Sequence, residues 1–153
     1  MIIGDSSALI ALCVVDKLEL LEKLYDNLFV PQAVYDEVTE VGKAQSDKLK
    51  QFLQSRVKVV DLNLTKLGLG IGELEAITLY KELDADVLFI DDNRAKKYAV
   101  LNDVKVIGSL GVLIKAKENG YIEKVKPLLE EIMKSEVYIS DKLVSKVLDI
   151  CNE

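Results

Sequence analysis

Short apolar runs alternate with amphipathic helical patterns along this chain of 153 residues, and this alternation restricts the folds open to it. Apolar runs of this kind, bounded by helical patterns, indicate strands that are buried in a parallel sheet. Right-handed connections between such strands place helices on both faces. The sequence therefore predicts an α/β fold, a three-layer α/β/α sandwich with a central, mainly parallel sheet of about five strands. The expected strands cover residues 1–4, 28–30, 57–60, 87–90 and 104–107.

The spacing of apolar residues also predicts how the helices face the core. Val34, Val38 and Val41 would mark the inner face of a helix that begins at Pro31, where a missing N–H costs nothing. The helix over residues 44–55 is expected to be exposed.

No linker or internal repeat divides the chain, so we expect a single domain over residues 1–153. Its core would cover about residues 1–120, and a C-terminal helical extension would cover about 121–153. Ser140 is expected to cap the last helix. The two helices of the extension are expected to form an appendage rather than part of the core.

Acidic residues stand where two of the apolar runs end. Asp5 follows residues 1–4, and the pair Asp91 and Asp92 follows residues 87–90. Ligands of open α/β sheets bind beyond the carboxyl ends of the strands. If these two strands are neighbours, their terminal carboxylates converge on one small volume.

Two glutamates on helical patterns could reach the same volume. Glu37 lies three residues after Val34 and so shares the inward face of its helix, while Glu73 opens another helix. A group of carboxylate oxygens suits a hard divalent cation, Mg²⁺ or Mn²⁺. Metal-activated water then makes phosphodiester hydrolysis the reaction that best matches these residues.

The chain contains no histidine, which excludes many other mechanisms. It cannot form a Ser-His-Asp or Cys-His nucleophile system or a histidine-based zinc site. No phosphate-binding glycine motif follows the first strand either, because Gly68, Gly70 and Gly72 are not preceded by a strongly apolar run.

Each acidic residue taken alone also has a structural explanation. Asp5 could cap the helix that follows it, and one of Asp91 and Asp92 could cap the next helix. Glu73 could be an acid favoured by the helix dipole, and Glu75 is expected to be exposed. Only the conjunction of these residues in one topology favours a functional site.

The net charge of −6 argues against broad, nonspecific binding of nucleic acid through a basic surface. The basic stretch over residues 43–58 is interpreted as a solvated helix face. Arg94, Lys96 and Lys97 follow the acidic pair directly, so they could equally hold phosphate or be solvated. No apolar run is long enough to span a bilayer and no signal peptide is recognisable, so no membrane association and a cytoplasmic location are expected. Cysteines 13 and 151 are expected to stay reduced.

Several segments resemble the motifs of PIN domains, a family of metal-dependent nucleases. The resemblance covers residues 1 to about 120, and its last strand and helix are similar to those of a prokaryotic, VapC-like subgroup that includes predicted toxins of toxin–antitoxin pairs. The matching segments are residues 2–10 (IIGDSSALI), 30–38 (VPQAVYDEV), 70–77 (GIGELEAI), 90–93 (IDDN) and 106–113 (VIGSLGVL).

The resemblance implies that Asp5, Glu37, Glu73 and Asp92 are the catalytic acids and hold Mg²⁺ or Mn²⁺. It favours Asp92 over Asp91 as the metal ligand. Asp91 would contact the ligands rather than the metal. A glutamate stands at position 73 where many members have aspartate, which lengthens the reach of this carboxylate by one methylene. Residues that could contact the substrate are Ser6, Asn93, Arg94, Lys97 and Ser109.

The function implied by the resemblance is that of a metal-dependent endoribonuclease, the toxin of a toxin–antitoxin pair. Its partners would be an RNA substrate, a small antitoxin protein and a second copy of the chain. One alternative is a non-catalytic PIN-like module that binds nucleic acid or protein. Another is a phosphotransfer receiver or an aspartyl phosphatase, although neither places its acidic residues as this chain does.

Overall fold

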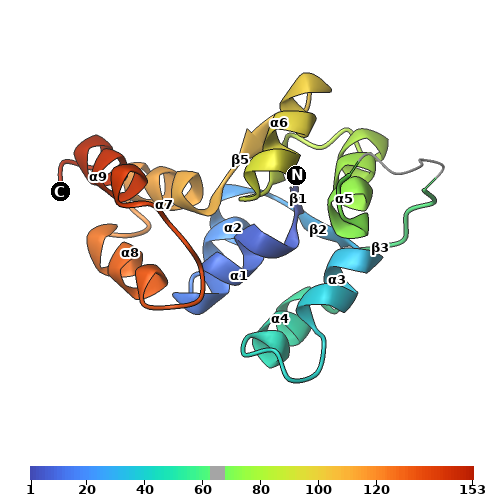
Figure 1. The fold of residues 1–153 in the computed structure, drawn as a ribbon, viewed down its shortest axis with the longest axis horizontal. Coiled ribbons are helices and arrows are strands. Elements are labelled where there is room, and N and C mark those ends of the chain that lie inside the picture. Colours follow the sequence, from blue (N-terminus) through green and yellow to red (C-terminus); the bar gives the residue numbers. More distant parts are fainter. Residues whose placement is uncertain (63–67) are drawn as a thin grey trace.

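A computed structural model describes residues 1–62 and 68–153, and a parallel sheet lies at its centre (Figure 1). Within the described residues the sheet has five strands in the order β3-β2-β1-β4-β5, and every neighbouring pair is parallel. The predicted α/β/α architecture is confirmed. The strands are β1 (Ile2–Gly4), β2 (Leu28–Pro31), β3 (Val57–Lys58), β4 (Val87–Phe89) and β5 (Val106–Ile107).

Helices connect the strands and cover both faces of the sheet, as the crossover rule requires. No helix in the described part of the chain is both long and apolar enough to cross a membrane. The helices are α1 (Ser6–Val14), α2 (Glu19–Leu24), α3 (Gln32–Val38), α4 (Ser46–Leu53), α5 (Ile71–Glu82), α6 (Asn93–Leu101), α7 (Ser109–Glu118), α8 (Lys126–Met133) and α9 (Asp141–Ile150).

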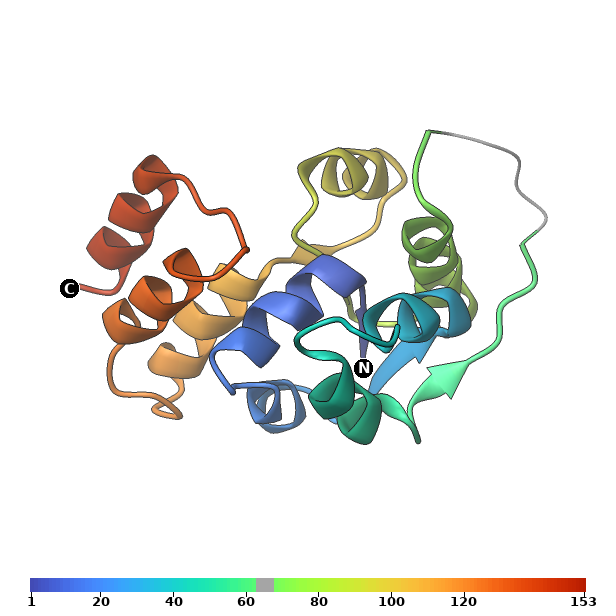
Figure 2. The same cartoon turned by 60° about the horizontal axis from the view of Figure 1, so that its bottom comes forward.

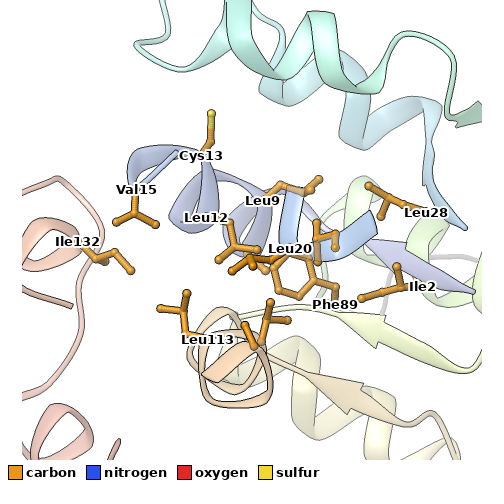
Figure 3. Packing of buried hydrophobic residues seen from close by; sticks show 14 of the residues in the cluster. Ile2, Leu9, Leu12, Cys13, Val15, Leu20, Leu28, Phe89, Leu113 and Ile132 are labelled. Carbon is orange, nitrogen blue, oxygen red and sulfur yellow. The ribbon is translucent and has the colours of Figure 1, made fainter. Parts of the chain in front are cut away.

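The sheet separates two hydrophobic clusters because successive side chains of a strand point to opposite faces. In β1, Ile2 packs in the cluster with α1, α2 and α7, while Ile3 packs in the cluster with α5 and α6. In β4, Phe89 and Leu88 divide in the same way. Figure 3 shows Phe89 beside Ile2 in the first cluster. All four side chains are fully buried.

The C-terminal helices α8 and α9 are continuous with the first cluster rather than separate from the core. Leu129 and Ile132 of α8 and Val147 of α9 belong to it. Figures 1 and 2 both show α7, α8 and α9 grouped at one end of the molecule, with α5 at the other end. Ser140 caps α9 as predicted, because its side chain accepts a hydrogen bond from the N–H of Leu143.

Two expectations about the segment between β2 and β3 are wrong. Helix α3 ends at Val38, so Val41 is 98% exposed instead of facing the core. Helix α4 is not simply exposed, since Leu49 and Leu53 are fully buried. The predicted strand over residues 57–60 is also shorter, because β3 ends at Lys58.

Candidate functional site

The four predicted acids, Asp5, Glu37, Glu73 and Asp92, line one pocket of about 720 Å³, which we call the acidic pocket. The pocket lies at the carboxyl ends of β1 and β4, where the parallel topology brings the ends of neighbouring strands together. Asp5 follows β1 and Asp92 caps α6 after β4, while Glu37 comes from α3 and Glu73 from α5. Residues that are far apart in the sequence are therefore gathered by the sheet.

Asp5 is the buried member of this group, with a residue exposure of 3%. Its backbone N–H donates to the carbonyl of Phe89 at 2.9 Å, which fixes the start of α1 against β4. Its carboxylate makes no hydrogen bond that caps α1 and accepts one from the Ser7 hydroxyl at 3.1 Å. Burial raises the pKa of Asp5 to about 6. The Ser7 hydroxyl and the backbone N–H groups of Ser6 and Ser7 oppose this rise, and the charge of Glu73 adds to it.

Glu37 faces the acidic pocket from α3 but is exposed, not buried with Val34 as its spacing suggested. The Ser6 hydroxyl donates to Glu37 Oε2 at 2.7 Å, which links α1 to α3. A Cβ atom on Gly72 would lie 3.4 Å from Glu37 Oε2 and 3.3 Å from Val34 Cγ2. Glycine at position 72 therefore lets the start of α5 approach α3 closely.

Glu73 and Asp92 both bond to backbone N–H groups at helix starts. Glu73 accepts from the N–H of Gly70 at the start of α5. Asp92 accepts from the N–H of Ala95 at 2.7 Å and so caps α6. The structural explanations considered from the sequence therefore hold for these two residues, while both carboxylates still border the acidic pocket.

Each of these four carboxylates accepts a hydrogen bond from the protein. Over residues 1–62 and 68–153, no three Asp, Glu or Cys side chains are gathered closely enough to hold a metal ion. The residue types nevertheless fit a hard cation, because carboxylate oxygens surround one pocket and, among the described residues, the buried Asp5 accepts a single side-chain hydrogen bond.

Asp91 is used differently from Asp92. Its carboxylate accepts from the Ser109 N–H at 2.8 Å and the Ser109 hydroxyl at 2.6 Å, and Lys96 Nζ lies 3.8 Å away. A Cβ atom on Gly108 would come within 2.6 Å of Asp91 Oδ1, so the close approach needs glycine. Asp91 thus ties the end of β4 to the start of α7.

Ser7 connects the two aspartate positions and was not identified from the sequence. Its hydroxyl donates to Asp5 and accepts from the Asp91 N–H at 3.3 Å. Ser6, which was identified, bonds Glu37 instead. The available signal was the placement of two serines directly after an aspartate at a strand end, which offers hydroxyls on two different sides of the helix start.

The residues predicted to contact substrate are dispersed. Ser109 is buried and bonded to Asp91, and Asn93 lines a neighbouring groove. Arg94 reaches the glycine loop before α5, since a Cβ atom on Gly68 would lie 2.5 Å from its Nη2 atom. Lys97 is exposed and lines neither the acidic pocket nor that groove.

Glu75 was expected to be exposed, and this expectation is wrong. It is half-buried, and its carboxylate accepts from the N–H of Ala33 at 2.9 Å. The contact joins α5 to the first turn of α3, where backbone N–H groups lack partners within the helix. Glu75 therefore positions the two helices that carry Glu37 and Glu73.

The family model DUF3368, described as a PIN domain, matches residues 1–153. The chain therefore belongs to the PIN-domain family, whose members are generally nucleases that act on nucleic acids and usually use divalent metals. A search among curated proteins returned no match. The sheet order also differs from the 2-1-3-4-5 order of receiver-like folds, so the fold does not support the phosphotransfer alternative.

Proposed function

We propose that this protein is a metal-dependent endoribonuclease and that it acts as the toxin of a toxin–antitoxin pair. The observation that carries the proposal is the convergence of Asp5, Glu37, Glu73 and Asp92 on one pocket beyond β1 and β4. The family supplies the reaction class, nucleic-acid hydrolysis. The motif resemblance supports the two finer parts of the proposal, which are RNA as the substrate and the toxin role.

The four acids would hold Mg²⁺ or Mn²⁺, as one ion or as two. When bound, such a cation supplies a Lewis acid for the scissile phosphate and a more acidic water molecule. Asp91 would not be a ligand, because its carboxylate is already bonded to Ser109 and faces Lys96.

The electrostatics of the acidic pocket make cleavage dependent on a cation. Carboxylates that border one pocket repel each other and also repel a phosphodiester. The pKa of Asp5 is raised mainly by burial, and the negative charge of Glu73 adds to the rise. Ser7 fixes the buried carboxylate, while Ser6 holds Glu37 at the exposed side of the pocket.

The test is cleavage of a labelled RNA in Mg²⁺, in Mn²⁺ and in EDTA. We expect the wild type to cleave only with a divalent cation and Asp5→Asn to cleave at least about 100-fold more slowly. Glu40→Gln is the matched control, because Glu40 is exposed and its only ion-pair partner within the described residues is Lys43. Undiminished cleavage in EDTA, or by Asp5→Asn, would contradict the nuclease assignment.

The toxin role has a separate test in a bacterial host. We expect induced expression of the wild type to arrest growth and expression of Asp5→Asn to leave growth unaffected. Co-expression of the neighbouring reading frame should restore growth if it encodes the antitoxin. Cleavage in vitro without growth arrest would retain the nuclease and reject the toxin.

A second candidate is a PIN-like module that binds nucleic acid or protein without cleaving it. One observation favours it: each of the four acids accepts a hydrogen bond from the protein, and no described group of three is assembled for a metal. Calorimetric titration with Mn²⁺ separates the candidates. Binding that Asp5→Asn abolishes supports the nuclease, whereas no binding by a folded wild type supports the module.

A further inference from the structure

A second depression adjoins the acidic pocket, and we call it the C-terminal groove. It has a volume of about 740 Å³ and lies between α1, the starts of α6 and α7, and the segment formed by residues 137–140 with α9. Ser7, Ile10 and Asp92 line both depressions. A polymer bound at the acidic pocket can therefore continue into the C-terminal groove.

The floor of the C-terminal groove is apolar and incompletely covered. Leu143, Val147 and Ile150 lie on one face of α9 and line it, opposite Ile10 and Ile114. Val147 is buried, but Leu143 is 44% and Ile150 is 51% exposed. These side chains form a surface on which a flat apolar group can rest.

The rim of the groove carries an aromatic ring and two cations. Tyr138, in the connection between α8 and α9, is 88% exposed and lines the groove. Lys146 also lines it and forms no ion pair among the described residues. Lys96 lies on the opposite wall, where it partly offsets the charge of Asp91.

These features match the chemistry by which proteins hold single-stranded nucleic acid. Unstacked bases bind to aromatic and apolar side chains, while cations contact the phosphates. A duplex hides its base faces and could not use the apolar floor. The net charge of −6 argues against attraction of the strand by a broad basic surface, so binding would depend on local groups such as these.

We propose that the C-terminal groove binds the nucleotides of single-stranded RNA that adjoin the phosphate held at the acidic pocket. A base stacks on Tyr138 and the apolar face of α9, and a backbone phosphate lies near Lys146. The inference rests on the proposed function for the choice of RNA. It assigns to α8 and α9 the recognition of the strand, separate from the acids.

The experiment measures binding rather than cleavage, with otherwise wild-type protein, a fluorescent, mixed-sequence single-stranded RNA and EDTA, which withholds the cation that cleavage needs. We expect Tyr138→Ala to raise the Kd about tenfold or more and Tyr138→Phe, which keeps the ring, to leave it nearly unchanged. Lys146→Gln should raise the Kd about threefold or more and reduce its dependence on salt.

Matched controls lie close by. Lys142 is exposed on the same helix as Lys146 but does not line the groove, and Tyr121 is a partly exposed tyrosine elsewhere. Lys142→Gln and Tyr121→Ala should leave the Kd within about twofold. The mutated tyrosine and lysine side chains of the groove are exposed, so circular dichroism should show that these variants fold like the parent.

The proposal is overturned if Tyr138→Ala and Lys146→Gln bind RNA as well as the controls do. It is also overturned if a duplex of the same length competes as strongly as the single strand. An apolar partner or a second copy in the groove would give the first of these results. Because the readout is binding, absence of cleavage by the wild type contradicts the nuclease alone and leaves this test intact.

Discussion

Two neighbouring strands of this protein end in aspartates that serve different purposes. The register of the sheet pairs Gly4 of β1 with Phe89 of β4, so Asp5 and Asp91 lie close to each other at the carboxyl ends of these strands. Asp91 accepts two hydrogen bonds from Ser109 and faces Lys96, whereas the buried Asp5 accepts one from Ser7. The bonds of Asp91 join β4 to α7, whereas burial disfavours the charged form of Asp5 unless a ligand such as a cation compensates it.

The largest expected effect that tests this difference comes from Asp5→Asn. Besides losing cleavage, this variant should be more stable than the wild type at pH 7.5 without metal. The pKa shift from 3.8 to about 6 sets an upper limit of roughly 3 kcal/mol. Urea unfolding in EDTA measures the gain, and a loss of stability would break the comparison.

The pH dependence of stability is a second test of whether ionised Asp5 destabilises the fold. The pKa of Asp5 is raised in the folded state, so its contribution to stability is fully present below about pH 3.8 and is lost as pH rises through about 6. The free energy of unfolding of the wild type should therefore fall relative to that of Asp5→Asn across this window. Parallel curves for the two proteins would contradict the shift.

Asp91→Ala should have the opposite effect on stability. It removes two hydrogen bonds that join β4 to α7 and leaves Ser109, which is 2% exposed, without its partner. We expect a loss of about 2 kcal/mol in the free energy of unfolding, measured in urea at neutral pH. Glu131→Ala, at an exposed position on α8, is the surface control.

Ser7→Ala probes the residue that touches both aspartates. Loss of its bonds to Asp5 and to the Asp91 N–H should cost about 1 kcal/mol. Because the Ser7 hydroxyl lowers the pKa of Asp5, its removal should raise that pKa further. The stability curve of Ser7→Ala should then fall over a higher pH range than that of the wild type, and an unchanged range would reject this link.

Glu153 is a third carboxylate for this comparison, and its replacement should change stability least over most of the pH range. Desolvation alone would raise its pKa, but Lys117 and the N–H groups of Val125 and Lys126 lower the pKa to about 2. A depressed pKa contributes stability above about pH 4.5 that is lost as pH falls towards 2. Glu153→Gln should lose about 1 kcal/mol at pH 7, and this loss should shrink as pH falls through about 2, measured by thermal unfolding.

The sequence predicts the scaffold of the site better than its contacts. Alternation of strands and helices predicts the sheet, and the polarity change at its strand ends predicts that Asp5 and Asp92 share a pocket. The burial of Glu75 and the bond between Asp91 and Ser109 escape such a reading, because each depends on a partner in another element. Side-chain partners across elements are set by the packing of helices, which periodicity alone does not specify.

The C-terminal helices illustrate the same limit. Their amphipathic patterns predict that they form, but a pattern does not say which surface they cover. Val147 belongs to the core, whereas Leu143 and Ile150 on the same face remain partly exposed beside the groove. That difference arises only after α7 and α9 are placed against each other.

The central position of β1 has a consequence for the order of events during synthesis. Residues 2–4 leave the ribosome before the other strands, yet β1 pairs with β2 on one side and with β4 on the other. At about 5–20 residues per second, β4 is synthesised on the order of ten seconds after β1. Asp92 is made later still, so the acidic pocket cannot assemble on a nascent chain that stops before β4, and any activity of the pocket is confined to chains that extend past Asp92.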